Sequence, residues 1–287
     1  MKISEIIKKE TPSLSFEVFP PKNSESYESI KSSALEIAKL NPDFMSVTYG
    51  AGGTTGSYTI DIAESIVRTG VTPIAHLTCV CSSRDKIRET LSEIKARGVE
   101  NILALRGDMP QGMTEKSLDF THANDLVEEI KDFGGFCIGG ACYPEGHTEC
   151  DSFTKDIQNL KIKVDAGCEF LTTQMFFDNH ILFNFLYKIR EAGITVPVIP
   201  GIMPITNANQ LERAVKLSGS FIPQKFLNLV DKFGAHPDTM MQAGIAYATE
   251  QIIDLYANGI KNVHVYSMNK PEVAEKIHSN LSSIIGK

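Results

Sequence analysis

Short β-rich segments alternate with amphipathic helical segments along the chain. Eight apolar runs end in small or polar residues, namely SLSFEVFP, DFMSVTYG, TPIAHLTC, NILALRG, CIGGACYP, FLTTQMFF, VPVIPGIM and NVHVYSMN. Apolar spacing predicts helices between them over 57–69, 84–97, 123–133, 152–166 and 180–192. Strands separated by helices pair in parallel, so eight such units in 287 residues predict a closed (β/α)₈ TIM barrel.

The breaks between these segments support a single barrel domain over residues 1–287. Most of the predicted helices lead to a glycine that can accept a positive φ: Gly70, Gly98, Gly134, Gly167 and Gly193. The interval 207–259, between the seventh and eighth strands, has room for extra helices. A doubly wound open sheet is the alternative, but GAGGTTG at 50–56 lacks the GxGxxG spacing and leads into a loop.

Composition narrows the class of partner. A net charge of -7 without a basic cluster argues against nucleic acid and against an anionic membrane surface. The N-terminus MKISEIIKKE has no apolar signal core, and no apolar run approaches the length of a membrane span, so we expect a cytoplasmic protein. The six cysteines form no CxxC pair, as expected of reduced thiols.

The run CYPEGHTEC raises the question of a metal site. Cys142, His147 and Cys150 are possible zinc ligands, but their spacing is irregular and no fourth ligand stands beside them. This pattern fits a catalytic loop better than a closed structural site, so we expect no metal.

The first strand carries an acidic residue in apolar surroundings. Alternation places Leu14, Phe16 and Val18 on one face and Ser15, Glu17 and Phe19 on the other. An unpaired buried carboxylate costs several kcal/mol or more, so Glu17 must be paired, protonated or used in chemistry.

Other polar and aromatic residues gather where the predicted strands end, which is where barrel enzymes place their catalytic groups. Each has a structural explanation when taken singly, as a core histidine, rim packing or a local ion pair. The set comprises Thr48, Tyr49, His76, Thr78, Arg106, Asp108, Tyr143, Glu145, His147, Gln174, Phe176, Tyr266 and Asn269. A polar stripe of Asp156, Asn159 and Lys163 follows on a helix, where spacing alone indicates a solvated face.

With these residues assembled, the chain resembles the methylenetetrahydrofolate reductase family in its short bacterial form. The resemblance runs nearly end to end through SFEVFPPK, SVTYGAGG, HLTC, ALRGD, YPEGH, NLKIKVDAG, TQMFFD, PGIMPI and HVYSMN. It implies a (β/α)₈ barrel that binds FAD and reduces 5,10-methylenetetrahydrofolate to 5-methyltetrahydrofolate. NADH or NADPH would reduce the flavin in a separate half-reaction, and a homo-oligomer is expected.

The resemblance also implies roles for individual residues. Glu17 matches the general acid and Asp108 the acid beside flavin and pterin, while Gln174, Gln210 and Lys270 match folate-binding positions together with these two acids. The matching FAD positions are Thr48, Tyr49, Ala51, His76, Arg106, Gly107, Asp108, His122, Ala123, Ala141, Tyr143, His147, Asp156, Asn159 and Lys163. Packing among aromatic rings leads us to expect a raised pKa for Glu17.

Three residues depart from the family pattern. Ile162 and Lys270 stand where arginine is usual, and His122 stands where tyrosine is usual.

The sequence leaves two other functions to weigh. A Schiff-base or zinc-dependent barrel is disfavoured because no lysine ends a strand and the cysteine pattern suits zinc poorly. A flavoprotein subunit that receives electrons from a protein partner remains the alternative.

Overall fold

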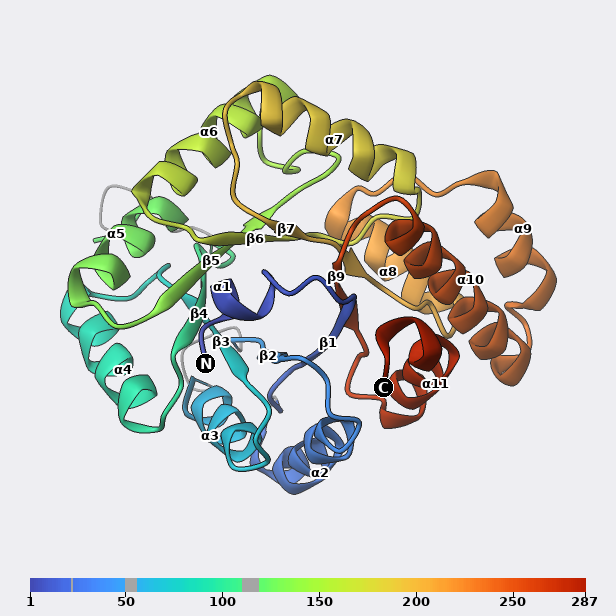
Figure 1. Ribbon diagram of the computed structural model, residues 1–287, viewed down its shortest axis with the longest axis horizontal. Helices are drawn as coiled ribbons and strands as arrows, with labels where there is room; N and C mark the ends of the chain where they lie inside the picture. The colour runs from blue at the N-terminus through green and yellow to red at the C-terminus, as the bar shows by residue number, and fades with distance from the viewer. Residues whose placement is uncertain (22, 50–55, 110–118) are drawn as a thin grey trace.

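The computed structural model of the protein describes residues 1–21, 23–49, 56–109 and 119–287. Ala51, expected at the cofactor, lies outside these ranges. The described strands form one parallel sheet in the order β7-β6-β5-β4-β3-β2-β1-β9-β8, drawn in Figure 1 as a ring of strands inside a ring of helices. Their bounds are β1 Ser13–Val18, β2 Met45–Val47, β3 Pro73–Thr78, β4 Asn101–Leu105, β5 Cys137–Cys142, β6 Phe170–Thr173, β7 Val198–Ile199, β8 Gly201–Ile202 and β9 Asn262–Tyr266.

The seventh predicted strand is two short strands that close the barrel together. β7 pairs with β6, while β8 pairs with β9. Pro200 separates them, and because proline has no N–H it interrupts the hydrogen-bond ladder. Its carbonyl still accepts a bond from His264 N at 2.9 Å. The predicted TIM barrel is confirmed, with its seventh position split at Pro200.

Helices surround this sheet as the alternation predicts. The five predicted helices match α3 Gly56–Val67, α4 Arg84–Ala96, α5 Ala123–Phe133, α6 Phe153–Ala166 and α7 Asn179–Glu191. Two further outer helices are α2 Tyr27–Ala38, after the 3-10 turn η1 Ser24–Ser26, and α11 Pro271–Ile285. The extra helices between the last two strands are α8 Ala208–Ser218, α9 Gln224–Phe233 and α10 Pro237–Ala257.

Local sequence explains where several helices start and stop. Ser83, Ser152 and Asn207 each accept a backbone N–H in the first turn of α4, α6 and α8, which satisfies a donor that the helix leaves free. The five predicted glycine stops all have positive φ, from 78° to 141°. These local signals therefore place helix ends to within about two residues.

Two apolar layers leave only one end of the barrel for polar chemistry. Leu14, Phe16 and Val18 of β1 pack outward in the core between strands and helices. Inside, α1 Ile3–Ile6 contributes Ile3 and Ile6 to a cluster with residues at the strand starts. Figure 1 shows α1 in the middle of the ring. The N-terminal end of the barrel is therefore filled around α1, whereas Glu17, His76 and Tyr266 lie in the C-terminal halves of their strands.

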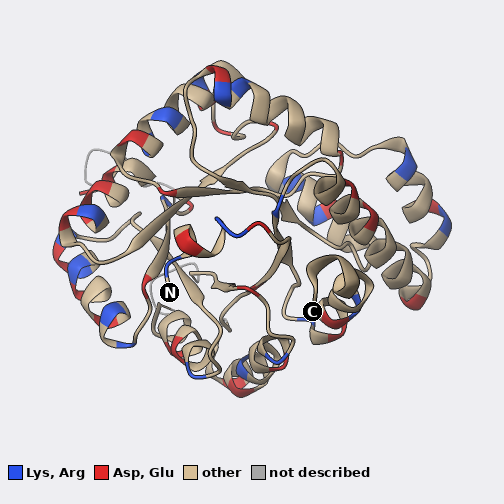
Figure 2. Ribbon diagram, in the orientation of Figure 1, with Lys and Arg blue, Asp and Glu red and all other residues tan. Residues whose placement is uncertain are grey.

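Charged residues are distributed over the outside of the ring. Figure 2 shows both signs interspersed along the outer helices, while the strands are mostly uncharged. No helix in the described ranges combines the length and apolarity needed to cross a membrane.

Candidate active site

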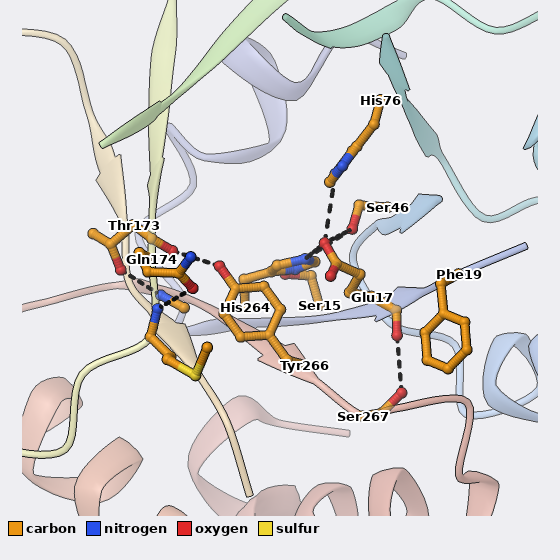
Figure 3. Close-up of polar contacts among 12 residues, drawn as sticks. Ser15, Glu17, Phe19, Ser46, His76, Thr173, Gln174, His264, Tyr266 and Ser267 are labelled. Atoms are coloured by element: carbon orange, nitrogen blue, oxygen red, sulfur yellow. Dashed lines mark hydrogen bonds and ion pairs between the residues drawn. The ribbon is translucent and has the colours of Figure 1, made fainter. Parts of the chain in front are cut away.

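Five polar side chains meet on the inner face of the barrel where its first and last strands pair. Strand register places Glu17 of β1 opposite Ser46 of β2, and Ser15 opposite His264 of β9. His76 enters from β3. Figure 3 shows these side chains pointing toward one another. The alternation that predicts an inward Glu17 is therefore confirmed, and it brings partners from three other strands.

The Glu17 carboxylate has three close polar neighbours. Its Oε2 accepts a hydrogen bond from Ser46 Oγ at 3.0 Å, and it lies 3.5 Å from His76 Nε2 and 3.8 Å from His264 Nε2. The side chain is only 19% exposed. Burial raises the pKa of Glu17, but the two histidines and Ser46 lower it by more, so the net shift is downward. The expected upward pKa shift is wrong because three other strands supply polar neighbours that the sequence of β1 does not reveal.

Hydrogen bonds continue from Glu17 through His264 to the backbone. Ser46 Oγ lies 2.9 Å from His264 Nε2, and Ser15 Oγ lies 2.8 Å from His264 Nδ1. Ser15 Oγ also donates to the carbonyl of Val263 at 3.0 Å. A hydroxyl has one hydrogen to donate. Because Ser15 gives its hydrogen to that carbonyl, Nδ1 of His264 must carry a hydrogen.

Two arrangements of the protons then satisfy every hydrogen bond that links Glu17, Ser46, His264 and Ser15. In one, Ser46 donates to a Glu17 carboxylate, so His264 Nε2 must donate to Ser46 and the imidazole is positively charged. In the other, Ser46 donates to His264 Nε2, the imidazole is neutral and Glu17 is a carboxylic acid that donates to Ser46. Both contain the same number of protons. The two arrangements therefore differ only in whether His264 or Glu17 holds the proton.

His76 faces this acid from the other side. The pKa of His76 is lowered, mainly because burial disfavours its charged form. Its Nε2 has no hydrogen-bond partner among the described residues. His76, expected at the cofactor, thus lies beside Glu17, with its Nε2 3.5 Å from the carboxylate and without a hydrogen bond to a described residue.

The residues expected to bind folate fall into two groups. Lys270 Nζ donates to Thr206 Oγ1 at 2.8 Å, and Gln210 Oε1 accepts from Thr206 N at 2.9 Å. Gln210 Nε2 also donates to Pro204 O at 3.3 Å, so its amide is engaged within its own loop. Gln174 directly follows β6, and the hydroxyl of Tyr266 donates to the carbonyl of Thr173, the residue before it (Figure 3).

The polar stripe on α6 is half-buried at Asp156 and Lys163 and exposed at Asn159, and two of its residues contact the loop 143–152. Asp156 Oδ2 accepts from His147 N at 3.2 Å, and Asn159 Nδ2 contacts Cys150 Sγ at 3.9 Å. Lys163 Nζ reaches back to the carbonyl of Ala141 on β5. The pKa of Lys163 is lowered because burial disfavours the ammonium form.

A second group of expected cofactor residues follows β4. Arg106 Nη2 pairs with Glu149 Oε2 at 2.6 Å, and the hydrogen bond from this guanidinium holds the pKa of Glu149 below its ordinary value. Gly107 has φ +87°, and Asp108 beside it is exposed.

The remaining expected positions lie along the same side of the barrel. Thr48 donates its N–H to Val18 O at 3.0 Å, directly after β2, and is followed by Tyr49, whose pKa is raised by burial. His122 is the exposed N-cap residue of α5, and Ala123 is the first residue of that helix. The ring of Tyr143 meets His147 edge-on at 4.5 Å. The expected cofactor residues with described structure thus extend from the end of β2 to α6.

Ser15, Ser46 and His264 were not among the predicted site residues. A signal for His264 exists, because in NVHVY it alternates with Val263 and Val265 and so faces the same side as Tyr266. Ser46 and Ser15 have no comparable signal, since a buried serine in a strand is ordinary.

Sequence comparisons give one consistent result. A family model described as "Methylenetetrahydrofolate reductase" matches residues 2–282. "5,10-methylenetetrahydrofolate reductase" of Pectobacterium carotovorum subsp. carotovorum is 36% identical, over 92% of this chain and 88% of that protein. "Methylenetetrahydrofolate reductase (NADH) 1" of Zea mays is 35% identical over 94% of this chain, which spans only 48% of the maize protein.

Comparison with solved structures supports the fold. An uncharacterised protein from Clostridium thermocellum, solved with two copies of 5-methyl-5,6,7,8-tetrahydrofolic acid, superimposes with a TM-score of 0.68 over the full length of both chains. Its sequence identity is 16%, so the similarity concerns the barrel alone.

Proposed function

Because this chain belongs to the methylenetetrahydrofolate reductase family, an oxidoreductase family, we propose that it reduces 5,10-methylenetetrahydrofolate to 5-methyltetrahydrofolate. The observation that carries this proposal is the inward carboxyl of Glu17 with a proton chain behind it. Reduction of this substrate needs an acid, because the carbon–N10 bond must break before the one-carbon unit can accept hydride. A proton on N10 makes that nitrogen a leaving group.

Glu17 is the group proposed to protonate N10. The proton moves from Glu17 to N10, the methylene–N10 bond breaks, and a cationic iminium remains at N5 of the substrate. Reduced FAD, when bound, would supply the hydride that converts this iminium to the methyl group. Proton, hydride and substrate therefore balance to 5-methyltetrahydrofolate and oxidised cofactor.

The lowered pKa of Glu17 requires a source for its proton, and His264 is that source in the proposal. An ion pair loses stability when water is excluded, because both charges are desolvated. A pterin ring that covers the site therefore favours the neutral arrangement, in which Glu17 holds the proton and His264 is uncharged. The proton would pass from His264 to Glu17 through the hydroxyl of Ser46, since Ser46 contacts both groups at about 3 Å.

The residues on the β4 to α6 side suit an anionic cofactor such as FAD. Arg106 directly follows β4, and Lys163 extends from α6 to the carbonyl of Ala141 on β5, so both cations lie near the carboxyl ends of strands. Arginine pairs well with phosphate oxygens. We assign the diphosphate to Arg106 and Lys163, and the remaining contacts to Tyr143, Asp156 and Asn159.

NADH is the reductant that the plant relatives' names indicate, and a protein electron donor is the alternative. Anaerobic flavin bleaching with NADH, and separately with NADPH, distinguishes these donors. Failure with both nucleotides would favour the protein donor.

The acid is tested by measuring the two half-reactions separately in rapid-mixing experiments with Glu17→Gln. Glutamine keeps the size of the side chain but supplies no acidic proton. We expect FAD binding and flavin reduction to persist, while reoxidation by methylenetetrahydrofolate slows by at least about 100-fold. Glu169→Gln, at a partly buried glutamate just before β6, is the matched control.

Two outcomes would refute parts of this proposal. Reoxidation of Glu17→Gln at nearly the unmodified rate would remove Glu17 as the acid. A purified protein that neither carries FAD nor takes it up would count against the flavin-dependent reaction.

A further inference from the structure

The side chain of Asn269 joins the end of the last strand to the end of the first. Its Oδ1 accepts the N–H of Phe19 at 2.9 Å, and its Nδ2 donates to the carbonyl of Phe19 at 2.9 Å. Both polar ends of the amide are thus used on the backbone of one residue, 250 positions away in the sequence. This two-point contact fixes the chain two residues after Glu17.

The turn that carries Asn269, residues 267–270, also contacts the backbone of Glu17. Ser267 Oγ donates to the backbone carbonyl of Glu17 at 2.9 Å, and Ser267 is 1% exposed. Figure 3 shows this contact beside the carboxyl group. At the other end of the turn, Lys270 N donates to Ser267 O at 3.1 Å. One short turn therefore contacts the acid's backbone and carries the cation Lys270.

The backbone of this turn adopts an uncommon conformation. Met268 and Asn269 have φ of 57° and 55°, in the left-handed region. Among the residues with described structure, they are the only adjacent non-glycine pair with positive φ. Asparagine tolerates this region better than most residues, whereas methionine gains no such relief. Such strain persists where the surrounding contacts hold it in place.

The sequence after Phe19 makes this contact hard to replace. Pro20 and Pro21 follow, and neither has an N–H to donate. The N–H of Phe19 is therefore the last backbone donor before Lys22, and Asn269 is its acceptor. Without Asn269, the path of the chain after β1 loses its anchor on the neighbouring strand.

We propose that Asn269 is a positioning residue that sets the distance between the acid Glu17 and the cation Lys270. This inference rests on the proposed function, in which Glu17 meets N10 of the folate and Lys270 meets a carboxylate of the same molecule. Both groups must reach one ligand at once, and a displacement of about 1 Å can cost about 100-fold in rate. Asn269 contacts neither reacting atom and acts through the backbone of Phe19.

Three substitutions separate the amide contact from the backbone conformation. Asn269→Asp keeps the acceptor for Phe19 N–H but places an oxygen against the Phe19 carbonyl. Asn269→Ala removes both bonds, and Asn269→Gly removes both while relieving the left-handed φ. Asn41→Ala is the matched control, since Asn41 is exposed and also has a left-handed φ, of 51°.

For all three Asn269 variants we expect normal FAD uptake and normal flavin reduction, with a selective defect toward folate. Rapid mixing should show reoxidation by methylenetetrahydrofolate slowed about tenfold to 100-fold, with weaker folate saturation. The pH profile of this half-reaction should also shift, because Glu17 moves relative to Ser46 and His264. Asn41→Ala should leave all of these quantities unchanged.

Several results would overturn the inference. Asn269→Asp with unmodified folate kinetics would show that the amide positions nothing. Asn269→Gly with unmodified kinetics beside an impaired Asn269→Ala would assign the effect to backbone strain. Equal losses in both half-reactions would indicate a general structural role. Failure of the unmodified protein to oxidise its flavin with folate would instead refute the proposed function.

Discussion

Ser46→Ala tests the hydrogen-bond chain by removing one buried hydroxyl. Ser46 is 2% exposed and contacts Glu17 Oε2 at 3.0 Å and His264 Nε2 at 2.9 Å. A hydrogen bond to a charged group contributes about 1.5–3 kcal/mol. We therefore expect the free energy of unfolding to fall by about 2 kcal/mol near pH 7, which raises the unfolding equilibrium constant roughly 30-fold.

The loss should depend on pH with a definite sign. Burial raises the pKa of Glu17, but its polar contacts lower it by more, to below the ordinary 4.5. A lowered folded-state pKa contributes stability above the unfolded value, and this contribution is lost as the pH falls through the folded value. Ser46 is one of the contacts that lower the pKa, so the difference between Ser46→Ala and the unmodified protein should shrink below about pH 4.5.

Urea titrations of FAD-free protein at pH 7 and pH 4 measure both effects. Ser92→Ala is the control, since Ser92 is exposed on α4 and its Oγ donates to the carbonyl of Arg88, at 2.8 Å. A loss below about 0.5 kcal/mol at pH 7, which is ordinary for surface substitutions, would show that Ser46 does not stabilise the carboxylate. A loss of equal size at both pH values would show that it acts by packing alone.

Three further predictions concern the cofactor side and the packing of the extra helices. Lys163→Ala should weaken FAD binding more than Lys161→Ala, because Lys163 reaches the strand ends whereas Lys161 pairs with a neighbour on its own helix; equal dissociation constants would refute this. Glu149→Gln should tighten FAD binding about two- to fivefold at low salt by releasing its arginine partner, and the gain should vanish in high salt. Gly244→Ala should lower the thermal midpoint by several degrees, because a Cβ there would overlap the carbonyl oxygen of Ile205; an unchanged midpoint would contradict this close packing of α10 on the loop after β8.

The parts of the fold that sequence predicts are those that depend on local pattern. Strand alternation places Glu17 on the inner face because the two-residue period is local. Glycine stops such as Gly134 and Gly167 mark helix ends because positive φ is a property of one residue. The split at Pro200 was not predicted, although a proline inside a strand indicates an interrupted hydrogen-bond ladder.

The parts that sequence does not predict depend on partners distant in the chain. The pKa of Glu17 shifts downward because Ser46 and His264 come from other strands, and their alignment follows from barrel register. The engagement of Gln210 within its own loop, and of Arg106 with Glu149, likewise depends on tertiary packing. Residue types therefore indicate the chemistry of the site, whereas the pKa and the hydrogen-bond partners of each side chain depend on the assembled barrel.

The pairing of β1 with β9 has a consequence for the order in which the molecule assembles. Contacts between residues about 250 positions apart form late, because the intervening chain must be ordered first. During synthesis, Glu17 emerges near the beginning, whereas His264 and Asn269 emerge only after nearly all of the barrel. We therefore expect the β2 to β6 side, with Ser46 and His76, to gain structure before Glu17 meets His264 of β9. Until the last strand docks, β1 exposes an unpaired edge that can pair with another chain, so the step that completes the acid site also removes an aggregation hazard.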